Sequence, residues 1–278
     1  MNMRTVSAFA VAAVSPLAAF AQTPSPFAEW QYSAGIPLER IYEPELPVWR
    51  IRIGPGTAFQ PLYDGSSRYH VLIGPSFDIR YRNLLFLSSG DGAGVDFLSG
   101  QNWRLSFAVA YDLGRREADD REHLQGLGNI NPAPALKLFG DYVISKQFPL
   151  DIRADIRRNL GGADGWIGDI GAYLPMPGSS ENFFWFAGPS VTFADSAYMN
   201  SWFGVNATQA ARSGYPQYRA SAGVKSYGLG VSASWLPARH WIMNADTAIQ
   251  QLVGSAAHSP ITQRATGVVL SISVDYEF

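Results

Sequence analysis

Four charged residues alternate in sign along one short segment of the chain. In LDIRADIR (150–157), Asp151, Arg153, Asp155 and Arg157 lie two residues apart. Because successive side chains of a β-strand point to opposite faces, these charges would share one face, with apolar residues on the other. Opposite charges at this spacing favour ion pairs with neighbouring strands. Such a ladder would either fill an interior or line a narrow polar path through it.

The other residue types that carry chemistry form no recognisable motif. No two of the histidines (His70, His123, His240 and His258) have the spacing of metal ligands, and no Ser–His–acid set can be argued from spacing. The chain has no cysteine, which excludes disulfides and thiolate sites. Two Gly-x-Gly sequences, in GDGAGVDF and GLGVSAS, do not stand between a strand and a helix, as a phosphate loop requires. We therefore expect no enzymatic activity, no metal and no cofactor.

The composition is poor in charge and rich in aromatic residues. Of the 278 residues, 16% are charged, 47% are hydrophobic and 13% are aromatic. In a typical soluble protein, roughly 25% of the residues are charged. The formal net charge of -2 gives no reason to expect a nucleic-acid partner.

Residues 1–21 have the features of a signal peptide. A short positive start (MNMR) precedes an apolar stretch, and AFA before Gln22 has the small-x-small form of a cleavage site. A membrane anchor is the alternative, but the stretch is short for a span of ~20 residues and contains Pro16. Residues 22–47 contain five prolines, and we expect them to form an extended periplasmic arm.

Period-two alternation recurs along the rest of the chain. In WRLSFAVAYD (103–112), every second residue from Trp103 to Tyr111 is apolar, and these residues share one face. The other face carries Arg104 and Asp112. Aromatic residues stand at the ends of such apolar faces. This is the position expected for the two aromatic girdles that lie at the membrane interfaces of transmembrane barrels. The opposite faces are small or charged rather than rich in Lys and Glu. A soluble β-sandwich also alternates, but these features favour an all-β transmembrane antiparallel β-barrel over residues 48–278.

We expect about twelve strands in this barrel, with ten as the alternative. They lie near 48–57, 69–80, 83–88, 93–98, 102–113, 134–146, 149–159, 164–174, 182–194, 222–236, 240–251 and 264–278. With a periplasmic N-terminus, the longest connections (114–133 and 195–221) are extracellular and every periplasmic connection is short, as in bacterial barrels. The expected location is therefore the outer membrane of a Gram-negative bacterium, reached by export.

The chain ends on TGVVLSISVDYEF, in which apolar residues recur at every second position up to Phe278. We expect this last strand to close the barrel, with Asp275 facing the lumen. A terminal aromatic residue also resembles the signal that outer-membrane proteins present to the barrel assembly machinery.

Two extracellular connections carry readable local signals. In NATQAARSG (206–214), Asn206 and Gln209 have the spacing of a capping box, and Gly214 stands where a glycine ends a helix. This predicts one short helix over about 207–213, which is either a lid over the barrel mouth or an ordered part of the loop. The loop GRREADDREH (114–123) would bind divalent cations or lipopolysaccharide phosphates, or its charges would compensate one another.

Several segments resemble the MipA/OmpV family of outer-membrane proteins, and together they span nearly the whole chain after residue 21. They are YDGSSRYHVLIGPSFDIRYRN (63–83), FLSSGDGAGVDF (86–97), LGRREADDREHLQGLGNI (113–130), RRNLGGADG (157–165), SAYMNSWFGVNATQAARSGYPQYRASAGVK (196–225) and GSAAHSPI (254–261). The fifth is the most distinctive. Trp202 stands where the family pattern has a tyrosine, and Ser226 where it has an acidic residue.

This resemblance implies an outer-membrane scaffold that joins a murein lytic transglycosylase to a penicillin-binding murein synthase. Its surroundings would be outer-membrane lipid and lipopolysaccharide. The alternative is a narrow pore or transporter for small polar solutes. Twelve strands lie between barrels of about eight, which side chains fill, and open porins of about 16–18. The inward Gly and Ser residues of SYGLGVSASW would leave room for water.

Overall fold

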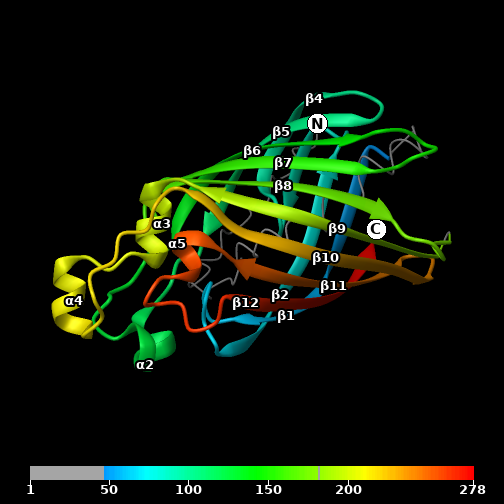
Figure 1. Ribbon diagram of the computed structural model, residues 1–278. Helices are drawn as coiled ribbons and strands as arrows, with labels where there is room; N and C mark the ends of the chain where they lie inside the picture. The colour runs from blue at the N-terminus through cyan, green and yellow to red at the C-terminus, as the bar shows by residue number, and fades with distance from the viewer. Residues whose placement is uncertain (1–46, 181) are drawn as a thin grey trace, which may run out of the picture.

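The alternating segments of the sequence form antiparallel strands that close into a barrel (Figure 1). The computed structural model describes residues 47–180 and 182–278. The expected signal peptide, and all but the last residue of the expected periplasmic arm, lie outside the described residues. Within the described part the barrel has twelve strands, not ten, which confirms the predicted fold class.

Each strand pairs with its neighbours in chain order. The strands are β1 (Trp49–Pro61), β2 (Tyr69–Tyr81), β3 (Leu85–Ser88), β4 (Gly92–Ser99), β5 (Trp103–Asp112), β6 (Ala133–Val143), β7 (Asp151–Asn159), β8 (Gly165–Pro175), β9 (Phe183–Ala194), β10 (Gly223–Ala238), β11 (Trp241–Leu252) and β12 (Thr266–Glu277). The last strand closes the barrel by pairing with the first, from Arg52 opposite Glu277 to Phe59 opposite Leu270. The backbone N–H of Phe278 donates to the carbonyl of Ile51 at 3.0 Å, which extends this seam to the last residue.

The two faces of the strands differ as the alternation predicts. Along β5, Trp103, Phe107 and Tyr111 are exposed on the outside, while Arg104 and the small residues between them are buried inside. Aromatic rings near the C-terminus contact one another on the outside: Tyr276 lies 5.3 Å from Trp241 and 5.0 Å from Phe278, between ring centroids. The outer surface is therefore an apolar wall edged with aromatic rings, which suits contact with lipid.

The two ends of the barrel are unlike. At one end, here called the loop end, the connections include residues 113–132 and 195–222 and carry all the described helices. These are η1 (Glu117–Asp120), α2 (Arg121–Leu124), α3 (Ser196–Phe203), α4 (Ala207–Ser213) and α5 (Gly254–Ala257). At the other end, the turn end, the connections are short and the C-terminus lies among them (Figure 1).

The helix predicted over 207–213 is present as α4, but α3 precedes it in the same connection and was not predicted. No helix in the described residues is both long and apolar enough to cross a membrane.

Candidate functional site

The inner face of the barrel carries a network of buried ion pairs around Asp91. This residue lies in the turn between β3 and β4 and is fully buried. Its Oδ1 accepts hydrogen bonds from Lys137 Nζ on β6 at 3.0 Å and from Arg153 Nη2 on β7 at 2.9 Å. Two cations from neighbouring strands thus share one carboxylate, which offsets the cost of burying the three charges.

Asp141 on β6 links the same network to β5. Its two carboxylate oxygens accept from Arg104 Nε at 2.7 Å and from Arg153 Nη1 at 3.3 Å. The ring centroid of Phe139 lies 4.9 Å from Lys137 Nζ, 4.7 Å from Arg153 Cζ and 5.4 Å from Arg104 Cζ. Cation–π contacts are strongest where water is excluded. One aromatic face and two carboxylates therefore hold three cations together.

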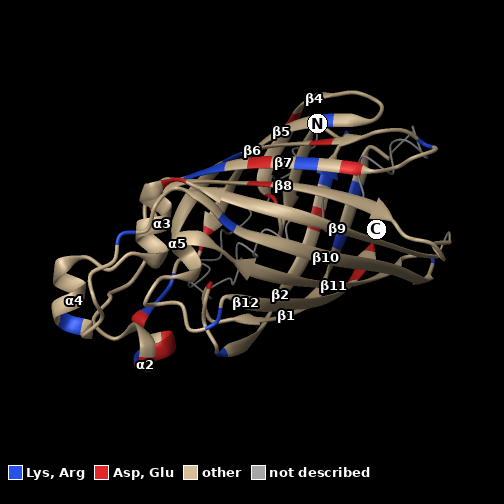
Figure 2. Ribbon diagram, viewed as in Figure 1, with Lys and Arg blue, Asp and Glu red and all other residues tan. Residues whose placement is uncertain are grey.

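The network continues toward the neighbouring strands on both sides. On β2, Arg80 Nε lies 3.0 Å from Asp78 Oδ1, and Arg157 Nη2 of β7 lies 3.2 Å from Asp169 Oδ2 of β8. Figure 2 shows acidic and basic positions alternating along β7. The two inward arginines of this strand, Arg153 and Arg157, each meet a carboxylate on an adjacent strand, so the charges fix strand to strand across the inner face.

The structure places the seven residues expected to line the lumen in different surroundings. Arg104, Asp151, Arg153, Arg157 and Asp275 are buried, and the side chain of Asp155 is 7% exposed. Asp112 is half-buried at the loop end and accepts from Asn159 Nδ2 at 2.6 Å. Asp275 accepts from Ser273 Oγ at 2.7 Å. Neither carboxylate oxygen of Asp151 has a hydrogen-bond partner within the described residues.

The sequence reasoning missed Lys137, Asp141 and Asp91, which are central to the network. For Lys137 and Asp141 a signal exists: they alternate with Leu136, Leu138 and Tyr142, so their strand has an inner face with both charges. Asp91 has no such signal, because it lies in a turn and no periodicity indicates where its side chain points.

The remaining arc of the barrel is lined differently. On β10, Gly228, Gly230 and Ser232 alternate with the outward Tyr227 and Leu229. Opposite Ser232, the buried Asp246 of β11 accepts from Ser271 Oγ of β12 at 3.4 Å. This arc therefore carries small and hydroxyl side chains around the Asp246 carboxylate, whereas paired charges occupy the arc from β2 to β8.

Four connections at the loop end pack into a single layer, here called the outer cap (residues 62–68, 113–132, 195–222 and 253–265). Tyr198, Met199 and Phe203 of α3 are buried in a cluster with Ile167 of β8 and Leu252 of β11. A second cluster joins all four connections through Tyr63, Leu124, Leu127, Val205 and Ile261. Burial raises the pKa of the Tyr63 phenol to about 12. Buried apolar contacts of this kind make the cap an ordered part of the fold.

The predicted helix caps lie at the ends of α4. The Asn206 side chain accepts from the Gln209 N–H at 2.9 Å, and the Gln209 side chain accepts from the Asn206 N–H at 2.9 Å. Gly214 ends the helix in the left-handed region, with φ of 77°. No residue of α4 is buried, so this helix lies on the outside of the cap, whereas α3 and α5 pack on the barrel wall.

The charged loop 114–123 forms ion pairs within itself and with Arg68 of the connection 62–68. The buried Asp120 accepts from Arg68 Nη1 at 3.1 Å and lies 3.0 Å from His123 Nδ1, and Arg116 pairs with Asp119 at 2.8 Å. Among residues 47–180 and 182–278, no group of three or more potential ligands is placed to hold a metal ion.

The closed barrel, with its apolar outer wall and polar interior, belongs to the class of outer-membrane β-barrel proteins. A family model described as MltA-interacting protein MipA matches residues 53–278. The chain therefore belongs to the MipA family, as the resemblance indicated, and is located in the outer membrane.

Solved structures of outer-membrane proteins are similar to this chain at low sequence identity. The channel DcaP of Acinetobacter baumannii has 7% identity and a TM-score of 0.38, with 82% of this chain and 96% of that chain covered. The CymD monoaromatic hydrocarbon channel has 8% identity and a TM-score of 0.40, with 88% and 93% covered. OprD from Pseudomonas aeruginosa has 9% identity and a TM-score of 0.35, with 82% and 65% covered. A comparison with curated proteins finds no match.

Proposed function

We propose that this protein is an outer-membrane scaffold whose barrel interior is closed and whose surfaces bind its partners. The observation that carries the proposal is the buried network around Asp91 and Asp141. Its charged side chains pair with one another between β5, β6, β7 and the β3–β4 turn. Charges that neutralise each other inside a barrel serve its structure, and leave less attraction for a passing solute.

The proposed partners come from the family. Its model is described as an MltA-interacting protein, and the resemblance implies a murein lytic transglycosylase and, through it, a penicillin-binding murein synthase. The turn end faces the periplasm in bacterial barrels. Its connections are short: residues 82–84, 100–102, 144–150, 176–182 and 239–240. A stable interface needs about 800 Å² from each partner, so we propose that the arm, residues 22–47, supplies much of the contact.

A binding experiment on the arm tests this proposal. Folded protein lacking residues 22–47 should retain the barrel but capture much less purified lytic transglycosylase than the protein with the arm. Folding is checked by the difference in gel mobility before and after boiling. A matched control replaces the arm by a Gly/Ser segment of equal length, which should also fail to bind. Undiminished capture by either variant would show that the arm is not the interface.

A narrow pore for small polar solutes is the second candidate. The observation that favours it is the arc of small side chains on β10, where Gly228, Gly230 and Ser232 face inward. These residues leave space beside the charged arc, and water or a small solute would pass there. Neither candidate assigns a chemical reaction to the protein.

A further inference from the structure

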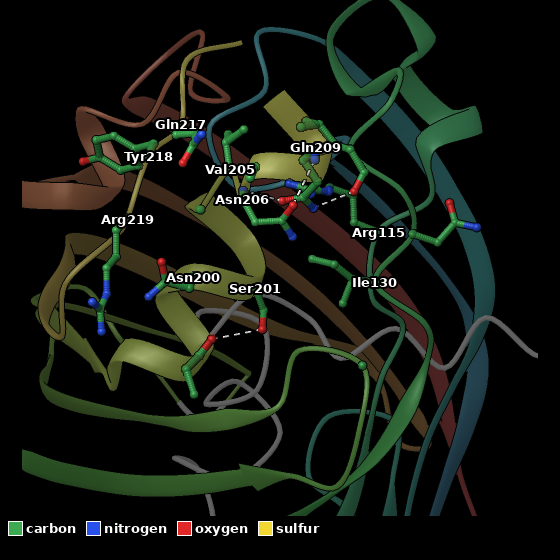
Figure 3. Close-up of a pocket in the computed structure, with 16 residues that line it drawn as sticks. Arg115, Ile130, Asn200, Ser201, Val205, Asn206, Gln209, Gln217, Tyr218 and Arg219 are labelled. Carbon is green, nitrogen blue, oxygen red and sulfur yellow. Dashed lines mark hydrogen bonds between the residues drawn. The ribbon is translucent and has the colours of Figure 1, made fainter. Parts of the chain in front are cut away.

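The outer cap contains a cavity of about 740 Å³ between α3, the start of α4 and the connection from β5 to β6 (Figure 3). Small-molecule sites typically have volumes of about 300–1,000 Å³. Arg115 and Arg219 line this cavity, and none of its lining residues is Asp or Glu. In the view of Figure 3 the two arginines lie on opposite sides, with Asn200 and Ser201 between them. The formal charge of the cavity lining is therefore positive.

Arg115 is a buried cation without an acidic partner in the described residues. It is 3% exposed, its Nη1 donates to the carbonyl oxygen of Trp202 at 2.9 Å, and its Nε has no hydrogen-bond partner. The guanidinium Cζ also lies 5.6 Å from the ring centroid of Tyr63. Burial lowers the pKa of Arg115 to about 10, so the side chain stays protonated at neutral pH. A buried charge is costly unless it is paired, and an anion in the cavity would supply the pair.

Arg219 and Gln217 enter the same cavity from the segment after α4, and both are exposed. Two other amide groups of the lining already donate hydrogen bonds to backbone carbonyls. Asn200 Nδ2 donates to the carbonyl of Ala220 at 2.7 Å, and Gln209 Nε2 donates to that of Leu127 at 2.7 Å. These bonds fix the wall of the cavity. The side chains of Arg219 and Gln217 are accessible to a ligand.

We propose that this cavity binds a small organic anion that carries hydroxyl groups, with its carboxylate or phosphate held by the exposed Arg219, while Arg115 adds positive charge on the opposite side. The planar guanidinium group matches both oxyanions in a two-pronged geometry. The Gln217 amide suits the hydroxyl groups of a sugar, and the Ser201 hydroxyl, which already donates to the carbonyl of Ala197 at 3.0 Å, can accept from one. The anion is either a free sugar acid or sugar phosphate, or the phosphorylated headgroup of lipopolysaccharide. The proposal is independent of whether the barrel is a scaffold or a pore.

Titration calorimetry on the folded protein in detergent tests this site. The probes are glucose 6-phosphate and glucuronate, with glucose as the uncharged control. Vesicles with and without lipopolysaccharide, compared by flotation, test the lipid-borne source. We expect saturable binding of at least one anionic probe, weakened by added salt, and no binding of glucose. Arg219→Gln should weaken it about tenfold or more, as loss of a charge-assisted hydrogen bond does.

The control variant is Arg212→Gln, because Arg212 is an exposed arginine of α4 that does not line the cavity. It should bind as the unchanged protein does. Arg115→Gln removes the second positive charge of the lining, and should also weaken binding if its boiling-dependent gel shift shows a folded barrel. If the protein binds lipopolysaccharide vesicles but neither soluble anion, and Arg219→Gln abolishes this binding, the anion is the lipid headgroup. Absence of saturable binding to every anionic probe, or equal binding by Arg219→Gln and Arg212→Gln, would overturn the proposal.

Discussion

At the scale of single residues, Asp91 connects the strands of the charged arc. Lys137 and Arg153 reach the same carboxylate oxygen at 3.0 and 2.9 Å, and all three side chains are nearly inaccessible to water. Removing a shared buried carboxylate would leave two neighbouring cations without that partner, although Arg153 keeps Asp141.

Asp91→Asn should therefore lower the free energy of unfolding by about 3 kcal/mol, the scale measured when one partner of a buried ion pair is removed. The measurement is urea unfolding of the protein folded into lipid vesicles. Asp164→Asn is the control, because Asp164 pairs with Arg158 at 2.8 Å but its side chain is 66% exposed. Exposed pairs contribute about 1 kcal/mol or less. Equal losses in the two variants would show that the network does not hold the barrel together.

The sequence predicts the charges of this arc better than it predicts their partners. Period-two alternation puts Arg153 and Arg157 on one face because that pattern is local. Which carboxylate each arginine meets depends on the register between strands and on the turn that carries Asp91. Neither can be deduced from a segment alone, since register is fixed by pairing across the sheet.

At the scale of elements, the seam between β1 and β12 depends on a close backbone approach. A Cβ atom at Gly54 would lie 1.8 Å from the carbonyl oxygen of Val274 and 2.8 Å from the Cα of Asp275. Both atoms belong to the backbone of β12, so neither can move without shifting the strand. At Gly56, two residues further along the same inner face, the nearest atom would be 3.6 Å away.

Gly54→Ala should therefore disturb closure of the barrel, at a cost of about 2 kcal/mol or more from overpacking. Gly56→Ala should be close to neutral. The two variants differ by one methyl group each on the same strand, which makes them a matched pair. The yield of heat-modifiable folded protein and its thermal midpoint measure the effect, and a similar outcome for both substitutions would refute the close approach at the seam.

The helices of the outer cap differ in how well the sequence predicts them. The capping box and the terminal glycine of α4 are local signals, so that helix was predictable to the residue. The start of α3 also has a local signal, since the Asp195 side chain accepts from the Tyr198 N–H at 2.8 Å. Its main stabilisation is the burial of Tyr198, Met199 and Phe203 against distant strands, and such tertiary contacts are not visible in the segment itself.

At the scale of the whole molecule, the barrel is asymmetric both around its circumference and along its axis. Around its circumference, paired charges line the strands from β2 to β8, whereas glycine and serine from Gly228 to Ser232 line β10. Along its axis, long packed connections at the loop end contrast with short connections at the turn end (Figure 1). The length asymmetry was predictable from the spacing of the strands. The packed clusters of the cap were not, because they join residues from four separate connections.

A closed interior implies that the protein acts through its surfaces. Conductance of single molecules of the folded protein in a planar lipid bilayer distinguishes a closed interior from an open one. A closed interior predicts a silent bilayer, with folding verified by the boiling-dependent gel shift. Asp91→Asn, which removes one carboxylate of the network, should then produce conductance. Discrete conductance steps in the unchanged protein, altered in size or ion selectivity by substitutions of Arg153 and Arg157, would contradict a closed interior and identify the protein as a pore.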